Sequence, residues 1–156
     1  MPVTSRYDPV ENRYIREDTL AVSERTLRTR VTLAQLNAGF TLLPALPGFI
    51  YSLIDCNMIA IGGAATTGTS VNVIGTRGGS PVQLFVAAVA GLTQSTNLRA
   101  GSPFATAGTA SIVCLADGAS FTPLDVNTPV TVITVGSAMT VMTNIDVTLE
   151  FTITPA

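Results

Sequence analysis

Apolar and polar residues alternate most regularly near the end of the chain, and this alternation predicts β-strands. Segments 129–135 (PVTVITV) and 146–154 (DVTLEFTIT) both follow the two-residue period of a strand. The second segment places on one face Val147, Leu149, Phe151 and Ile153, and on the other Asp146, Thr148, Glu150 and Thr152. We therefore expect two strands here, the second with one apolar and one polar face.

The longest apolar run, 49–61, does not alternate in this way. Its β-branched and aromatic residues favour a strand, and its continuity indicates that both faces of that strand are covered. Upstream of it, residues 34–38 permit one helical turn that Gly39 can end, because glycine readily adopts a left-handed conformation. Residues 30–33 and 40–43, on either side of this turn, predict short strands.

The middle of the chain holds short β-like segments separated by Gly, Ser and Thr. Strands are expected at 71–74, 81–86 and 109–115, a helical turn at 87–92, and turns at 77–80 (RGGS) and 117–118 (DG). Several short strands between turn signals indicate an all-β fold. We expect a jelly-roll-like sandwich or barrel of short antiparallel strands, with one or two helical turns.

Charge divides the chain into two parts. Of the 18 charged residues, 11 lie in residues 1–30 and 7 in residues 31–156. We therefore expect two regions, an extended charged N-terminal arm (1–30) and a β-sandwich body (31–156). A body this poor in charge is costly to leave fully in water, which favours an oligomer over a monomer coated with uncharged polar residues.

The arm is expected to dock on a protein surface. All eight basic residues are Arg, whose planar group makes several contacts at once and stays charged when partly buried. Nucleic-acid binding is disfavoured by the acids interleaved with these arginines and by the net charge of −2. Arg77, at an expected loop tip, is a further candidate contact. The expected docking residues of the arm are Arg6, Tyr7, Arg13, Tyr14, Arg16, Arg25, Arg28 and Arg30.

Residues typical of catalysis and metal binding are scarce. The chain has no His, which excludes a Ser-His-Asp triad and the usual histidine metal sites, and its glycine pairs do not fit a phosphate-binding loop. Its two cysteines, Cys56 and Cys114, are expected as free thiols. The acids Asp55, Asp117, Asp125, Asp146 and Glu150 could in principle include a glycosidase pair, but turn formation or solvation explains Asp117 and Asp125 more simply. We expect no enzyme activity and no cofactor.

Two further observations concern targeting. The first residues lack the charged-then-apolar pattern of a secretory signal. No uninterrupted apolar run reaches the ~20 residues that a membrane-spanning helix needs. We therefore expect no membrane partner.

The order of segments resembles the small head-decoration, or cement, proteins of tailed bacteriophages. The residues that carry the resemblance are VTLAQLNAG, a short strand and a Pro-Gly turn, MIAIGG, AAVAGLTQ, FTPLDVNTPVTVITVGS and DVTLEFTIT, between residues 31 and 154. The resemblance implies a structural virion protein on the capsid exterior, assembled in the host cytoplasm. It would bind the major capsid protein as an oligomer, with a trimer as the expected state, and stabilise contacts between capsid subunits.

Two alternatives remain beside this interpretation. One is another phage structural role, as a minor capsid, head-fibre or tail protein. The other is a carbohydrate-binding β-module, although the chain has no Trp and only 6% aromatic residues to stack on sugars.

Overall fold

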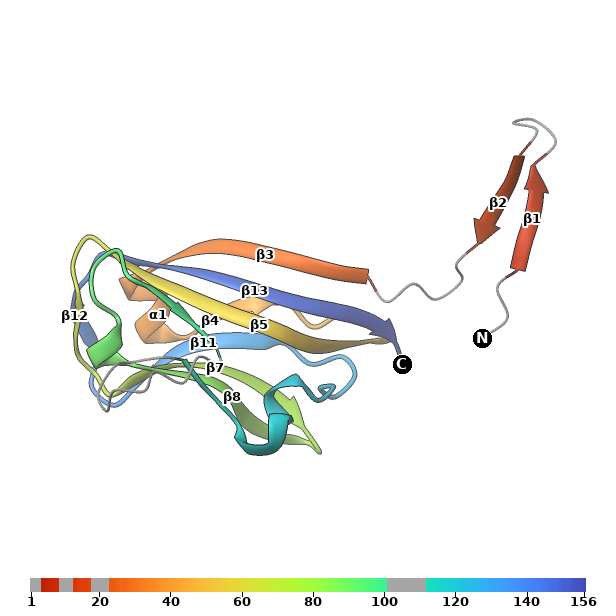
Figure 1. Ribbon diagram of the computed structural model, residues 1–156. Coiled ribbons are helices and arrows are strands. Elements are labelled where there is room, and N and C mark those ends of the chain that lie inside the picture. Colours follow the sequence, from red (N-terminus) through yellow and green to blue (C-terminus); the bar gives the residue numbers. More distant parts are fainter. Residues whose placement is uncertain (1–3, 9–12, 18–22, 101–111) are drawn as a thin grey trace.

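The computed structural model describes residues 4–8, 13–17, 23–100 and 112–156, and these form an all-β sandwich (Figure 1). One layer is a four-stranded antiparallel sheet. Its strands, in spatial order, are β3 (Ser23–Thr32), β13 (Asn144–Pro155), β5 (Phe49–Ile61) and β9 (Asn97–Arg99).

The second layer is a five-stranded antiparallel sheet that faces the first. Its strands, in order, are β10 (Ile112–Cys114), β8 (Ser80–Ala88), β7 (Ser70–Arg77), β11 (Val130–Val135) and β4 (Phe40–Leu43). A short pair, β6 (Ala65–Thr67) with β12 (Met139–Val141), adds to the body. The two layers remain separate sheets, so of the two expected architectures the structure shows the sandwich.

The core lies between the two layers, where alternate residues of every long strand point inward. Each layer contributes fully buried side chains to this core, such as Leu149 of β13 in the first layer and Phe85 of β8 in the second. The remaining face of each sheet points outward. This arrangement follows from the two-residue period of a strand.

The helical turn expected at 34–38 is the helix α1 (Leu33–Ala38). Thr32 and Gln35 form a capping box, in which each side chain satisfies a backbone N–H of the other residue. The helix ends at Gly39, whose φ of 88° favours glycine.

Asn37 fixes this helix to the body. Its Nδ2 donates to the Met139 carbonyl oxygen (3.1 Å), and its Oδ1 accepts from the Met139 backbone N–H (2.9 Å) and the Thr134 hydroxyl (3.0 Å). One side chain therefore holds α1, the end of β11 and the start of β12 together.

The expected strand at 49–61 is confirmed, but the expectation that both its faces are covered is wrong. Buried residues alternate along β5 with half-exposed ones, and Ile54 occupies a bulge where it is 40% exposed. The outward positions of β5 carry Asp55, Asn57 and Ile59. They belong to a sheet with one solvated face, as antiparallel sheets often are.

Other expected elements are found with small differences. The helical turn at 87–92 is η1 (Val89–Gly91), while residues 117–118 lie in a 3₁₀ helix, η2 (Ala116–Phe121), rather than in a simple turn. Residues 112–114 of the expected strand at 109–115 form β10, and 109–111 lie outside the described residues. Two strands not expected in the N-terminal segment, β1 (Thr4–Asp8) and β2 (Arg13–Glu17), form a hairpin.

Candidate binding surfaces

The outer face of the four-stranded sheet is polar. Cross-strand register aligns its residues in rows that run through β3, β13, β5 and β9. The first row holds Arg30, Asp146, Ile59 and Asn97, the second Arg28, Thr148, Asn57 and Arg99, and the third Thr26, Glu150 and Asp55. We call this surface the polar face.

Two ion pairs tie neighbouring strands of the polar face together. Arg30 Nε and Nη2 donate to the Asp146 carboxylate at 2.6 and 2.8 Å, a bidentate contact between β3 and β13. This hydrogen bond raises the pKa of Arg30 and lowers the pKa of Asp146. Arg99 Nη2 donates to Asp55 Oδ2 at 2.9 Å, which raises the pKa of Arg99. Both pairs are partly exposed, so their contribution to stability is small.

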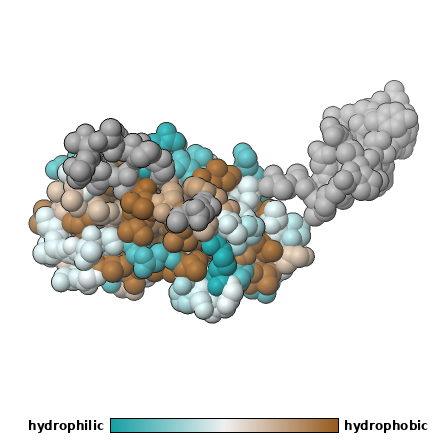
Figure 2. Space-filling model, turned by 60° about the horizontal axis from the view of Figure 1, so that its bottom comes forward, coloured by the Kyte–Doolittle hydropathy of each residue, from teal (hydrophilic) through white to brown (hydrophobic). Residues whose placement is uncertain are grey.

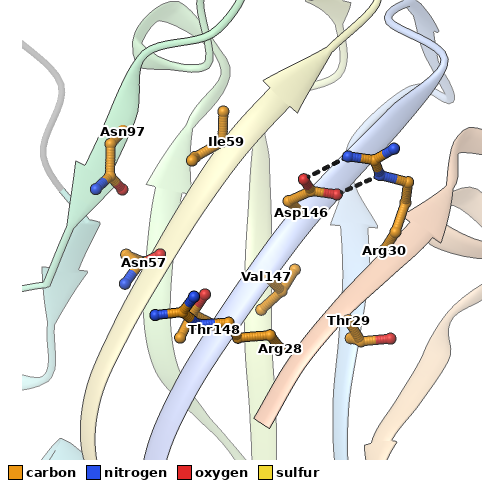
Figure 3. A pocket seen from close by; sticks show the side chains of 9 residues that line it. All are labelled: Arg28, Thr29, Arg30, Asn57, Ile59, Asn97, Asp146, Val147 and Thr148. Carbon is orange, nitrogen blue, oxygen red and sulfur yellow. Dashed lines mark hydrogen bonds and ion pairs between the residues drawn. The ribbon is translucent and has the colours of Figure 1, made fainter. Parts of the chain in front are cut away.

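A shallow groove of about 580 Å³ lies on the polar face (Figure 3). Figure 3 shows the Arg30–Asp146 pair at one side of the groove and the Arg28 side chain extending across β13. The lining residues are Arg28, Thr29, Arg30, Asn57, Ile59, Asn97, Asp146, Val147 and Thr148.

Arg28 is the charged side chain of this groove that is available to contact a partner. It is exposed, and within the described part of the chain it forms no hydrogen bond or ion pair. Together with the amides of Asn57 and Asn97, its guanidinium offers donors on one surface. Such a surface suits carboxylates and other polar groups of a partner.

The outer face of the five-stranded sheet is different in character. A row of aligned residues crosses it from Val113 through Val86 and Asn72 to Ile133, and the neighbouring rows carry Ile74 and Val135. Val113 is 62% exposed and Val135 is 36% exposed, whereas Asn72, in the middle of the row, is only 2% exposed. We call Ile74, Val86, Val113, Ile133 and Val135 the apolar face.

Figure 2 turns this side of the molecule toward the viewer and shows hydrophobic residues interspersed with hydrophilic ones. None of the described residues in these rows carries a charge. The sandwich therefore has one charged and one uncharged outer face.

The residues expected to form a docking arm fall into two groups. Arg6, Tyr7, Arg13, Tyr14 and Arg16 lie on the hairpin, where Tyr7 is opposite Tyr14 and Arg13 is opposite Asp8. Among the described strands, the hairpin is a two-stranded sheet of its own that pairs with neither layer.

Arg25, Arg28 and Arg30 are instead on β3, which is paired with β13 along its length. Residues 23–30 thus belong to the four-stranded sheet, although the charge distribution placed them in the arm. The part of the expected arm that precedes the sheet ends by residue 22.

Arg77 lies beside the expected loop tip, but its guanidinium is directed to the protein itself. Its Nη2 donates to the Thr122 carbonyl oxygen (2.7 Å), and its Nε to that of Pro123 (3.4 Å). The adjacent Gly78 and Gly79 donate their backbone N–H groups to Asp125 at 3.0 and 2.8 Å, which lowers the pKa of Asp125. These contacts hold the β7–β8 turn against the loop before β11.

Three of the acids that could supply a catalytic pair lie on the polar face, where Asp55 and Glu150 are opposite each other, and the other two lie elsewhere. Asp55 and Asp146 are in ion pairs, Asp125 accepts from the β7–β8 turn, Glu150 lies on the polar face, and Asp117 is in η2. No group of three or more His, Cys, Asp or Glu among the described residues could hold a metal ion.

Neither cysteine forms a disulfide, as expected. Cys56 is completely buried on β5, and this burial raises its pKa far above the usual range of a thiol. Tyr51 is 4% exposed and packs edge-to-face against Phe151.

The groove residues Asn57, Asn97 and Thr148 were not singled out from the sequence. The signal for Thr148 was the polar side of the 146–154 alternation, which forms the centre of the polar face. Asn97 lies on a three-residue strand that has no periodicity to reveal its direction.

Comparison with known proteins gives no further assignment, because no family model, no curated protein and no solved structure matches the chain. Within the residues that the structure describes, no helix has the length and apolar character needed to cross a membrane.

Proposed function

We propose that the protein is a non-enzymatic structural component of a virion, bound to the outside of a phage capsid as an oligomer, with a trimer as the expected state. In this role it binds the major capsid protein and stabilises contacts between capsid subunits. The resemblance of its segments to head-decoration proteins motivates the proposal.

The observation that carries the proposal is the difference between the two faces of the sandwich. The apolar face exposes Val113 and Val135 without a neighbouring charge, and such surfaces are stabilised by packing against another protein surface. The polar face and the hairpin carry the charges that suit reversible docking on a capsid. Three copies in one oligomer would add avidity to each docking contact.

Removing residues 1–22 tests the docking role. This deletion ends before β3, so it leaves both sheets of the body intact, whereas deleting residues 1–30 would remove most of an edge strand. The truncated protein is expected to remain folded and oligomeric and to lose co-sedimentation with heads built from the major capsid protein. Decoration of those heads at full occupancy by the truncated protein would disprove the role of the arm.

A Val113→Glu variant tests the apolar face separately. A carboxylate at this position opposes burial in a subunit interface, so the variant is expected to lower the mass of the oligomer in solution. Val113 is 62% exposed, so the fold of the single chain should persist by circular dichroism. An unchanged oligomer would place the subunit interface elsewhere.

The groove on the polar face supports one alternative, a carbohydrate-binding module. Amides and a guanidinium can donate hydrogen bonds to sugar hydroxyls, and Asn57, Asn97 and Arg28 line the same groove. Binding on a glycan array that an Asn57→Ala variant abolishes would favour this alternative over decoration.

A further inference from the structure

The free edge of the four-stranded sheet is an unusual feature of the body. β3 is ten residues long and lies at the edge of its sheet, paired with β13 on one side. Among the described residues, no strand pairs with its other side. An edge strand of this length presents a row of backbone donors and acceptors to another strand.

The outward side chains of this edge carry charges of both signs. Glu24, Thr26 and Arg28 lie opposite Thr152, Glu150 and Thr148 of β13, so they point to the polar face. All three are exposed, and Glu24 and Arg28 form no hydrogen bond or ion pair within the described residues.

The charge pattern of β3 is complementary to that of a second, antiparallel copy of β3. In an antiparallel pair of two β3 strands centred on Thr26, each Glu24 lies opposite the Arg28 of the other copy. Opposite charges at such positions stabilise strand pairs. The two charged groups, which have no partner among the described residues, would then pair with each other.

Other registers are less favourable. Centring the pair on Leu27 brings Glu24 opposite Arg30, whose guanidinium already binds Asp146 in a bidentate manner. Centring it on Arg25 or on Arg28 places like charges directly opposite each other, which destabilises a pair. Charges on edge strands usually prevent pairing, but this order of signs favours the register centred on Thr26 and opposes those centred on Arg25 and Arg28.

We propose that two copies of the chain associate through β3 in an antiparallel pair with Thr26 on the two-fold axis. The contact joins the four-stranded sheets of both copies into one continuous sheet. A two-fold contact of this kind is isologous and does not itself close a three-fold ring. It is therefore separate from the oligomer proposed above, and it would link copies that belong to different rings.

A charge exchange tests this contact in the full chain. Glu24→Arg and Arg28→Glu each replace two attractive pairs with two repulsive ones, so each is expected to weaken the association by about tenfold or more. The double variant, Glu24→Arg with Arg28→Glu, restores both pairs and has the same net charge as the original protein. It is the matched control and is expected to recover the association.

The measurement is molar mass by sedimentation velocity over a range of protein concentrations. Loss of the two-fold contact reduces a dimer to single chains, or, where a ring is also present, reduces linked rings to single rings. Equal association of all four proteins, failure of the double variant to recover, or absence of a two-fold species in the original protein would each overturn the proposal. Circular dichroism checks that every variant keeps its strands.

Disulfide trapping determines the register. In a Cys114→Ser background, a Thr26→Cys variant places two thiols opposite each other at the axis, where cross-strand Cβ atoms are about 4.5–5.5 Å apart. Oxidised glutathione is expected to link these chains into a covalent dimer. A Leu27→Cys variant should not be linked. Linkage through position 27 and not through position 26 would contradict the register centred on Thr26.

Discussion

Replacing Asn37 with Ala should destabilise the body much more than the same exchange at Asn57, an amide on the polar face. The exchange at Asn37 removes three hydrogen bonds, two to the backbone of Met139 and one from the Thr134 hydroxyl. Met139 is 1% exposed, so water cannot readily replace Asn37 at its N–H and carbonyl groups. The variant therefore leaves a buried donor and a buried acceptor without partners.

The size of the effect follows from these contacts. A hydrogen bond contributes a net ~0.5–1.5 kcal/mol, and a buried polar group left without a partner costs ~1–3 kcal/mol. Loss of the Asn37 contacts should thus lower the free energy of unfolding by about 3 kcal/mol. For a chain of this size, that corresponds to a decrease in Tm of about 6–12 °C.

Equilibrium urea unfolding followed by circular dichroism, with a thermal melt at the same protein concentration, measures this loss. The concentration must be fixed because self-association raises apparent stability. Asn57→Ala is the matched control, since Asn57 forms no hydrogen bond within the described residues and its exchange should cost less than ~0.5 kcal/mol. Equal costs for the two exchanges would refute the role given to Asn37 in fixing α1.

Three further predictions concern the core, the ion pairs and the thiols. Leu149→Ala should lower the free energy of unfolding by about 2–5 kcal/mol, measured by urea unfolding, because Leu149 is fully buried, whereas Ile54→Ala at an exposed bulge should cost much less. Because Arg30 lowers the pKa of Asp146, the pair contributes stability above the unfolded pKa of ~3.9, and unfolding at a series of pH values should show this contribution lost as pH falls through the lower folded pKa. Cys56 should resist iodoacetamide in the folded protein and react after unfolding in urea, as mass spectrometry can follow.

Each of these predictions has an outcome that contradicts it. Similar losses for Leu149→Ala and Ile54→Ala would mean that the two layers do not pack around Leu149. An Asp146→Asn variant with the same loss of stability in acid as the original protein would show that the pair with Arg30 has no influence on folding. Rapid alkylation of Cys56 under native conditions would contradict its burial.

The sequence was sufficient for the elements with a strong local signal. The long strand at 49–61 was predicted at its observed bounds because β-branched and aromatic residues fill it. The helical turn before Gly39 was predicted because glycine ends helices in the left-handed region. The alternation at 146–154 predicted both the buried face of β13 and the polar face on its other side.

The role of β3 could not be obtained in the same way. Its residues SERTLRTR are mostly polar because β3 is an edge strand with one solvated face, and this composition also suits an extended arm. What makes it a strand is pairing with β13, far along the chain, which local patterns do not reveal. The strands β6, β9 and β12 were missed because three residues are too few to establish a period.

The polar face was accessible from the sequence only in part. The alternation showed that Asp146, Thr148 and Glu150 share one side of a strand, but their neighbours depend on strand order and register. Neither the Arg30–Asp146 pair nor the groove beside Arg28 can be recognised from the sequence of β3 alone or of β13 alone.

The position of β13 between β3 and β5 has a consequence for the synthesis of the protein. Arg30 and Asp146, which lie opposite each other on the neighbouring strands β3 and β13, are separated by 116 positions in the chain. At about 5–20 residues per second, a ribosome adds β13 roughly 6–23 seconds after β3. During this interval β3 lacks β13, its partner among the described strands. The four-stranded sheet therefore cannot form until β13 has been synthesised.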